Sequence, residues 1–316
     1  MMPLIILSGP TAVGKTELSL KLAKKLNAEI ISADSMQVYR RMDIGTAKIK
    51  ASEMQGIRHH LIDIIEPAEE WNVLKFKTLA MEACKDICER GKIPLLTGGT
   101  GFYIQALLYD VEFTPENDTS VRERLNREYE QYGSARLYER LKEVDPDSAL
   151  IIHENNVKRV IRALEFFELN SYPISKHNSE QQKKRSPFDC VYFVLNDERK
   201  KIYERIDRRV DIMLENGLVT EVKALMDEGL DLSYVSMQGL GYKEIFRYLK
   251  GEISLEEAVY ILKRDTRHFA KRQLTWFRRE KDVVFINKNE FKNEDEILER
   301  MLEIIGQKTK ISIKEG

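Results

Sequence analysis

A phosphate-binding loop near the start of the chain restricts the possible folds more than any other feature of the sequence. Every specified position of the pattern G-x-x-x-x-G-K-[ST] is present. Its residues are Gly9, Pro10, Thr11, Ala12, Val13, Gly14, Lys15 and Thr16. An apolar run at residues 3–8 precedes the loop, and residues 15–26 follow it with leucines along one helical face. Strand, loop and helix in this order predict a P-loop that grips two adjacent phosphates.

The chemistry of such a loop follows from its backbone and from two side chains. Glycines let successive N–H groups point inward, and the helix dipole favours an anion at the N-terminus of the helix. Lys15 adds a positive charge, and the Thr16 hydroxyl is suited to a Mg²⁺ that also contacts the phosphates. We therefore expect a diphosphate or nucleotide ligand with Mg²⁺ as the cofactor. The pattern leaves open which group is attached to the phosphates.

Apolar and amphipathic segments alternate along much of the remaining sequence. Further strands are predicted at residues 29–33, 60–65, 93–97, 189–195 and 283–286. Helices are predicted at residues 72–90, from residue 102 onward, and over most of residues 198–280. This alternation predicts an α/β fold, with a P-loop NTPase-like parallel sheet flanked by helices.

The alternation is interrupted by a charged helical pattern at residues 118–170, with breaks at Gly133 and Asp145. The polar residues 171–187 that follow are typical of a flexible loop. We therefore expect an inserted all-helical subdomain at residues 111–188. The P-loop α/β core then comprises residues 1–110 and 189–316, and its C-terminal part is mostly helical.

The composition indicates a globular chain in the cytoplasm. Apolar residues make up 42% and charged residues 33% of the 316 residues, which excludes the disordered and fibrous classes. The longest apolar runs are too short to span a bilayer, and the first residues lack a secretory leader, so we expect no membrane contact. Three cysteines without a second Cys/His pair at zinc-finger spacing give neither a disulfide framework nor a zinc site.

A basic stretch at residues 263–281 contrasts with the net charge of −1 for the whole chain. It contains eight Lys and Arg residues and two acidic residues, and Phe269, Trp276 and Phe277 lie among them. Such a run is most often a solvated helix face. Cations that neutralise phosphates, together with aromatic rings that stack on bases, also suit single-stranded nucleic acid.

Asp34 is the candidate for acid–base chemistry. It follows the predicted strand at residues 29–33, and the carboxyl ends of parallel strands line the ligand crevice of α/β sheets. A carboxylate there can bind Mg²⁺, orient a sugar or accept a proton from an attacking nucleophile, and it can also simply cap a turn. Ser35 and Gln37 beside it can read the polar edge of a substrate.

Several classes of P-loop protein fit the sequence poorly. A GTPase needs the guanine-reading N-K-x-D, and the nearest match has Glu290 in place of the aspartate. No apolar run ends in a second magnesium-binding aspartate, which disfavours an ATPase. A small-molecule kinase that uses Asp34 on a hydroxyl and an RNA-binding NTPase accessory protein remain alternatives, although a kinase leaves the basic stretch without a role.

Six motifs spread over nearly the whole chain resemble one family. They are GPTAVGKT at 9–16, SADSMQVY at 32–39, MDIGTAK at 42–48, GGTGFY at 98–103, GLGY at 239–242 and AKRQLTW at 270–276. As a set they resemble the tRNA dimethylallyltransferase (tRNA isopentenyltransferase) family. The chain is similar to its shorter bacterial form, because the zinc finger that eukaryotic relatives append is missing.

The resemblance implies that a dimethylallyl group passes from dimethylallyl diphosphate to N6 of the adenosine just 3′ of the tRNA anticodon. It implies that the P-loop holds the diphosphate, that Asp34 is the general base, and that Thr11 and Arg209 assist. We expect a monomer that binds the anticodon stem-loop. The RNA contacts implied, besides Asp34, are Ser35, Met36, Gln37, Thr100, Arg122, Lys158, Arg159, Arg162, Arg267, Lys271, Arg272 and Gln273.

Overall fold

The structure is a computed structural model that describes residues 1–109, 120–181 and 186–311. The chain forms two compact units, and the first combines Met1–Leu108 with Pro187–Gly316. The second is Tyr109–Ser186. These limits lie two residues from those expected for the core and the inserted subdomain.

A six-stranded parallel sheet is the centre of the first unit, in the order β3-β2-β4-β1-β5-β6. Its strands are β1 (Met2–Ser8), β2 (Ala28–Ser32), β3 (His59–His60), β4 (Ile93–Gly98), β5 (Phe188–Asn196) and β6 (Val283–Asn287). The middle strands β1, β2 and β4 are mostly apolar and mostly buried, as expected for a parallel sheet covered on both faces. The predicted α/β fold class is confirmed.

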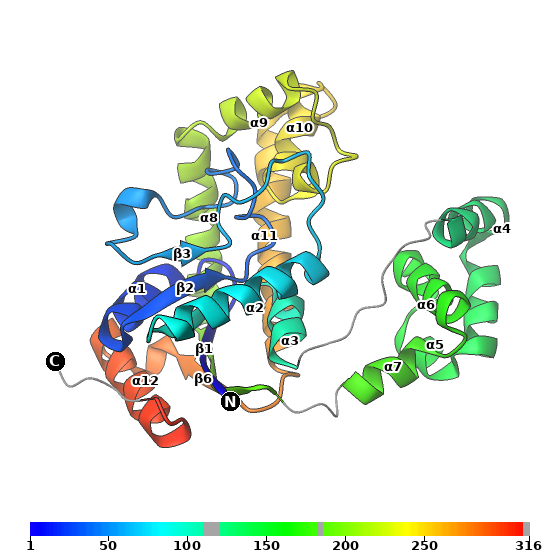
Figure 1. Ribbon diagram of the computed structural model, residues 1–316. Coiled ribbons are helices and arrows are strands. Elements are labelled where there is room, and N and C mark those ends of the chain that lie inside the picture. Colours follow the sequence, from blue (N-terminus) through cyan, green and yellow to red (C-terminus); the bar gives the residue numbers. More distant parts are fainter. Residues whose placement is uncertain (110–119, 182–185, 312–316) are drawn as a thin grey trace. The chain divides into compact units, whose positions relative to one another are not determined.

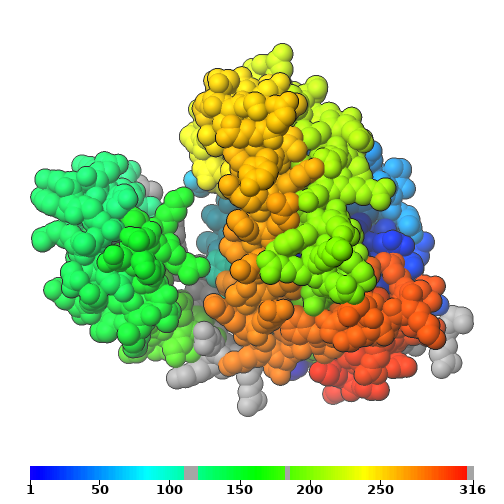
Figure 2. Space-filling view, turned by 180° about the vertical axis from the view of Figure 1, so that it is seen from behind, coloured from blue at the N-terminus to red at the C-terminus, as the bar shows by residue number. Residues whose placement is uncertain are grey.

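Helices cover both faces of this sheet (Figure 1). The helices of this unit are α1 (Lys15–Leu26), α2 (Val73–Glu89), α3 (Gly101–Leu108), α8 (Arg199–Glu215), α9 (Leu218–Asp227), α10 (Tyr242–Leu249), α11 (Leu255–Phe277) and α12 (Glu294–Lys308), with short 3-10 helices at Ala51–Glu53, Ser236–Gln238 and Lys288–Glu290. Helices α1 and α12 pack together against the sheet and share its apolar core, while α2 and α3 pack on each other. The long helices α8 and α11 run side by side and connect the sheet to α9 and α10 (Figures 1 and 2).

The strand predicted at residues 60–65 is wrong for most of its length. Only His59–His60 pair with β2, and the chain then turns away from the sheet. Leu61 and Asp63 have φ values of 63° and 54°, a left-handed conformation that cannot continue a strand. Ile65 returns as an isolated bridge to Tyr39.

The second unit is helical, as predicted. It contains α4 (Ser120–Val144), α5 (Pro146–Ile151), α6 (Val157–Asn170) and α7 (Ile174–Gln181) around a small apolar core. The predicted breaks are present, because Gly133 kinks α4 and Asp145 caps α5. The loop expected at residues 171–187 is wrong in part, since α7 occupies its middle. His177 of α7 packs on Phe166, with 5.0 Å between ring centroids, and this tertiary contact favours the helix.

No helix in the described residues is both long and apolar enough to cross a bilayer.

A buried carboxylate ties the edge of the sheet to the end of α2. Glu29 in β2 is 2% exposed and accepts hydrogen bonds from Arg90, from Lys92 at 2.9 Å and from His60 Nε2 at 2.8 Å. The Arg90 guanidinium above all, aided by Lys92 and His60, holds the pKa of Glu29 well below its ordinary value of 4.5 despite burial. The ionised form of Glu29 therefore stabilises the fold.

Replacing this carboxylate, Glu29→Gln, is expected to lower the free energy of unfolding at pH 7 by about 1.5–3 kcal/mol, the range for hydrogen bonds to a charged group. Because the folded pKa is depressed, the stabilisation is complete above the ordinary value of 4.5 and is lost as the pH falls below it. Urea unfolding of both proteins between pH 3 and 8 measures this difference. A gap that stays constant down to pH 3 would contradict the assignment.

Candidate active site

The carboxyl ends of β1, β2 and β4 surround a cavity of about 300 Å³ in the first unit. The P-loop follows β1, Asp34 follows β2, and Gly98 and Gly99 lie at the end of β4, so all three segments reach this cavity. Helices α8 and α11 add Arg209, Phe269 and Gln273 to its wall. The parallel order of the strands thus gathers residues from distant parts of the sequence.

The P-loop has the backbone that phosphate binding requires. Gly14 immediately precedes α1 with a φ of 100°, a conformation that side chains other than glycine rarely adopt. Ala12 is also left-handed, with a φ of 61°, and Val13 is fully buried below the loop. The ammonium group of Lys15 donates to the carbonyl oxygens of Gly9 and Pro10 at 2.9 and 2.8 Å, so it lies across the mouth of the loop.

Two cations face the cavity without a carboxylate partner of their own. Within the described residues neither Lys15 nor Arg209 forms an ion pair. Burial lowers the pKa of Lys15 to about 7, with a further contribution from Arg209, while Asp34 opposes the shift. Burial also lowers the pKa of Arg209. A bound anion would relieve the cost of burying these two charges.

Asp34 is oriented by the backbone that follows it. Its Oδ1 accepts the N–H of Met36 at 2.9 Å and the N–H of Gln37 at 3.3 Å, which fixes the carboxylate in a turn. Its Oδ2 accepts no hydrogen bond from the described chain. Asp34 therefore has both the structural role of a turn residue and one oxygen available on the cavity.

The wall beside Asp34 is built from polar groups and one aromatic ring. Gln37 lines the cavity and donates to the carbonyl oxygen of Thr46 at 3.3 Å, while Ser35 and Met36 are half-buried next to it. The N–H of Thr100 donates to Ala33 O at 3.2 Å, which brings it beside the end of β2. The aromatic ring is that of Phe269.

The sequence did not identify several residues that line the cavity. They include Ile30, Thr46, Ala47, Ile49, His59 and Ile62, whereas Phe269 belongs to the basic stretch whose aromatic rings suit stacking on bases. The only signal was indirect, because Thr46 and Ala47 lie within one of the six motifs, to which no role was assigned.

Helix α11 presents different groups on its two sides. Gln273 is 6% exposed, accepts the N–H of Thr11 at 2.9 Å and donates to Gly99 O at 2.9 Å. Both ends of its amide are engaged within the protein, so it contacts the P-loop and the end of β4. Lys271 and Arg272 point to solvent, and the Arg272 guanidinium lies 5.8 Å from the centre of the Phe269 ring. The helix thus carries exposed cations beside an aromatic ring at the cavity wall.

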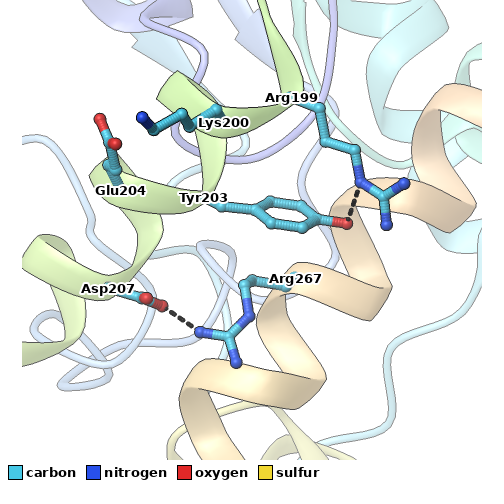
Figure 3. A pocket seen from close by; sticks show the side chains of 6 residues that line it. All are labelled: Arg199, Lys200, Tyr203, Glu204, Asp207 and Arg267. Carbon is cyan, nitrogen blue, oxygen red and sulfur yellow. Dashed lines mark hydrogen bonds and ion pairs between the residues drawn. The ribbon is translucent and has the colours of Figure 1, made fainter.

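Arg267 lies in a second, open pocket between α8 and α11 (Figure 3). Its guanidinium reaches across to Asp207 of α8 at 2.5 Å. In the same pocket Arg199 donates to the Tyr203 hydroxyl at 2.9 Å. The predicted RNA contact Arg267 is therefore already paired with a carboxylate, and its role as an RNA contact stays a prediction.

The other predicted RNA contacts lie in the helical second unit. Arg122 and Arg162 both donate to the carboxylate of the buried Glu165, at 2.7 and 3.0 Å, so they also stabilise this unit. Lys158 and Arg159 are exposed at the start of α6 and have no ion pair within the described chain. Of the predicted RNA contacts in that unit, Lys158 and Arg159 are therefore the most available to an anionic ligand.

The residues near the P-loop fit a magnesium ion that is bound together with a phosphate ligand. The Thr16 hydroxyl borders the cavity and makes no hydrogen bond to the described chain. No group of three or more His, Cys, Asp or Glu side chains in the described residues could hold a metal ion. A Mg²⁺ here would therefore take most of its ligands from the phosphates and from water, as Mg²⁺ commonly does.

Binding of inorganic pyrophosphate is expected to take up protons through Lys15. Because its pKa is about 7 in the free site, Lys15 is largely neutral at pH 8, and a bound anion raises its pKa by up to several units. Affinity should therefore fall as the pH rises above 7. Calorimetry in buffers of different ionisation enthalpy, with Lys15→Met as the control for protons bound by pyrophosphate itself, measures the uptake. Equal proton uptake by both proteins would contradict it.

Comparisons with known proteins agree with the geometry. A family model described as "IPP transferase" matches residues 37–280. The chain is 58% identical to a protein named tRNA dimethylallyltransferase from Lachnoclostridium phytofermentans, over 98% of this chain and 99% of that protein. It is 49% identical to a protein of the same name from Acetivibrio thermocellus, over 94% and 95% of the two chains.

Solved structures give the same answer. The full-length tRNA isopentenylpyrophosphate transferase of Bacillus halodurans superposes with a TM-score of 0.75 at 44% identity, over 98% of this chain and 97% of that one. A eukaryotic dimethylallyltransferase described as acting on tRNA gives a TM-score of 0.82 at 30% identity, over 100% and 81%. The family model, the relatives and the solved structures agree, and the chain belongs to the IPP transferase family.

Proposed function

We propose that this chain transfers the dimethylallyl group of dimethylallyl diphosphate to N6 of the adenosine just 3′ of the tRNA anticodon. The products are N6-dimethylallyladenosine and diphosphate. One observation carries the proposal: the same cavity is bordered by Lys15 and Arg209, which form no ion pair within the described residues, and by Asp34, a carboxylate with one available oxygen. This set suits an anionic leaving group beside a nucleophile that must lose a proton. Membership of the family supports the same reaction.

The donor fits the cavity by charge and by size. The P-loop backbone, Lys15 and Arg209 suit its diphosphate, and the Thr16 hydroxyl would hold the Mg²⁺ that neutralises the phosphate oxygens. Apolar side chains of Ile30, Ile49 and Ile62 line the same cavity, and they suit a short hydrocarbon chain. The volume of about 300 Å³ is at the lower limit of small-molecule sites, in agreement with a five-carbon donor.

The acceptor base must leave its stack to reach Asp34, at a cost of a few kcal/mol. Phe269 at the cavity wall offers a ring on which a base can stack, and Arg272 beside it offers a cation for the backbone. Gln37, Ser35 and Thr100 are the polar groups that could read the edge of the adenine. These features support an RNA acceptor over a small-molecule hydroxyl.

Each step of the transfer has a residue suited to it. Asp34 Oδ1 is held by two backbone N–H groups, which leaves Oδ2 to accept the proton of the N6 amine as the C–N bond forms. Negative charge grows at the same time on the departing diphosphate. Lys15 and Arg209 stabilise that charge in the position where it develops, which is the main electrostatic contribution to such a reaction.

A transfer assay tests the function directly. Labelled dimethylallyl diphosphate and unmodified tRNA should give labelled RNA without ATP, and a tRNA with another base at the acceptor position should give none. A small-molecule kinase, the principal alternative, would instead move label from the γ-phosphate of ATP. That outcome, with no label in the RNA, would overturn the proposal.

Removal of the base, Asp34→Ala, is expected to slow single-turnover transfer by about 10²–10⁴-fold, because general-base catalysis contributes that much. Pyrophosphate affinity should change much less. Asp227→Ala is the matched control, since Asp227 is exposed on α9 and lies outside the cavity. A transfer rate close to that of the wild type would remove Asp34 from the role of base.

The double variant Lys271→Ala/Arg272→Ala is expected to weaken tRNA binding and to reduce the slope of log affinity against log salt by about 1–2, since each phosphate contact contributes about 0.9. Its control is Lys24→Ala/Lys25→Ala, which removes two exposed charges from the end of α1. Filter binding between 50 and 300 mM KCl measures both slopes. Identical slopes for the two variants would show that α11 does not contact RNA.

A further inference from the structure

The loop that carries Thr46 into the cavity has no regular secondary structure of its own. Residues 42–48 form a series of turns between β2 and β3, and Thr46 and Ala47 line the cavity. Inside the loop, the Thr46 hydroxyl donates to Met42 O at 2.7 Å. Lys48 donates to Tyr39 O and Asp43 Oδ1, each at 2.6 Å, and to Asp63 Oδ1 at 2.5 Å. Further contacts to the loop come from α9 and α10, far away in the sequence.

A single carboxylate on α9 receives most of these contacts. Glu221 accepts three successive backbone N–H groups, those of Asp43 at 3.0 Å, Ile44 at 2.8 Å and Gly45 at 3.1 Å. It also accepts the hydroxyl of Tyr242 at 2.6 Å. Four donors on one carboxylate form a rigid, charge-assisted attachment.

Tyr242 closes the attachment from the other side. Its side chain is fully buried, and a Cβ added to Gly45 would lie 2.5 Å from its ring, so only glycine fits there. Burial, together with Glu221, raises the pKa of Tyr242, so the hydroxyl remains a donor at any physiological pH. A Cβ on Gly239, three residues earlier, would lie 2.5 Å from the Met36 Cε atom. The segment 239–242 thus contacts the polypeptide on both sides of Gln37.

The attachment continues to the cavity wall beside Asp34. The carbonyl oxygen of Thr46, next to Gly45, accepts the Gln37 side-chain amide at 3.3 Å, and the Ser32 hydroxyl donates to the other end of that amide at 3.4 Å. The N–H of Gln37 in turn donates to Asp34. Glu221 is therefore linked to the Gln37 side chain through Gly45 and Thr46.

We infer that Glu221 and Tyr242 are positioning residues for the acceptor base: they hold residues 43–46 so that Gln37 and Thr46 keep their places in the cavity. The inference rests on the proposed function, because it assigns this wall to the acceptor. It separates the site into two halves, since no hydrogen bond in the described residues joins Glu221 or Tyr242 to the P-loop. We therefore expect diphosphate binding at the P-loop to be independent of the attachment, and the acceptor half of the site to depend on it.

Three variants loosen the attachment in different ways. Tyr242→Phe removes one hydrogen bond and keeps the ring on Gly45, Glu221→Gln removes the charge, and Gly45→Ala forces the loop off the ring. Tyr248→Phe is the control, because Tyr248 lies on the same helix and its hydroxyl makes no hydrogen bond to the described chain. Melting temperatures are recorded for all four variants, and the assays are run well below them.

Single-turnover transfer with saturating donor should fall by about 10–100-fold in Glu221→Gln and Gly45→Ala, and less in Tyr242→Phe, since small misplacements cost that much. Pyrophosphate affinity should equal that of the wild type. A purely structural role predicts lower melting temperatures with normal transfer by the folded protein, and that result would overturn the inference. So would an equal loss of pyrophosphate affinity. If the wild type transfers no label to tRNA, the proposed function itself fails.

Discussion

The active-site cavity depends on the parallel pairing of three strands whose carboxyl ends stop at the same level. Ser8 of β1 pairs with Gly98 of β4, and Ser32 of β2 pairs with Thr97. The N–H of Ala33 extends this ladder to Thr97 O at 2.7 Å. The loops that follow the three strands therefore all begin at the same edge of the sheet. A shift of one residue in either register would move the P-loop away from the loop that begins with Asp34, and the cavity would lose one of its walls.

The charged side chains around the cavity determine which kind of ligand it favours. Burial above all lowers the pKa of Lys15, and Arg209 lowers it further. Burial also lowers the pKa of Arg209, which Asp34 opposes. Water alone solvates such a pair poorly, so the site favours a ligand with two or more negative charges. Asp34 is close enough to interact with both cations, yet it remains partly free because backbone N–H groups occupy only one of its oxygens.

The sequence predicted the parts of the site that depend on local rules. The P-loop, the strand before it and Asp34 at a strand end follow from spacing and apolar runs, and the structure has them where they were expected. The strand at residues 60–65 failed because left-handed residues cannot be recognised from an apolar run. Gln273 and Arg162 show the other limit: two residues that the resemblance implies as RNA contacts are also engaged within the protein, by a carbonyl oxygen and by a buried carboxylate, and their RNA contacts stay predictions. Such partners are known only after the chain has folded.

Helix α11 fixes the position of the P-loop relative to the face proposed for RNA. Within two turns it touches the P-loop through Gln273, borders the cavity with Phe269 and shows Lys271 and Arg272 to solvent. The distance between the phosphate loop and the face proposed for RNA is thus set by helical pitch and not by a flexible loop. A one-residue insertion between Arg272 and Gln273 would rotate Gln273 by about 100° relative to Lys271 and Arg272. Point substitutions can weaken the contact with the P-loop or the contact proposed for RNA. Only a change in helical phase would alter the position of one contact relative to the other.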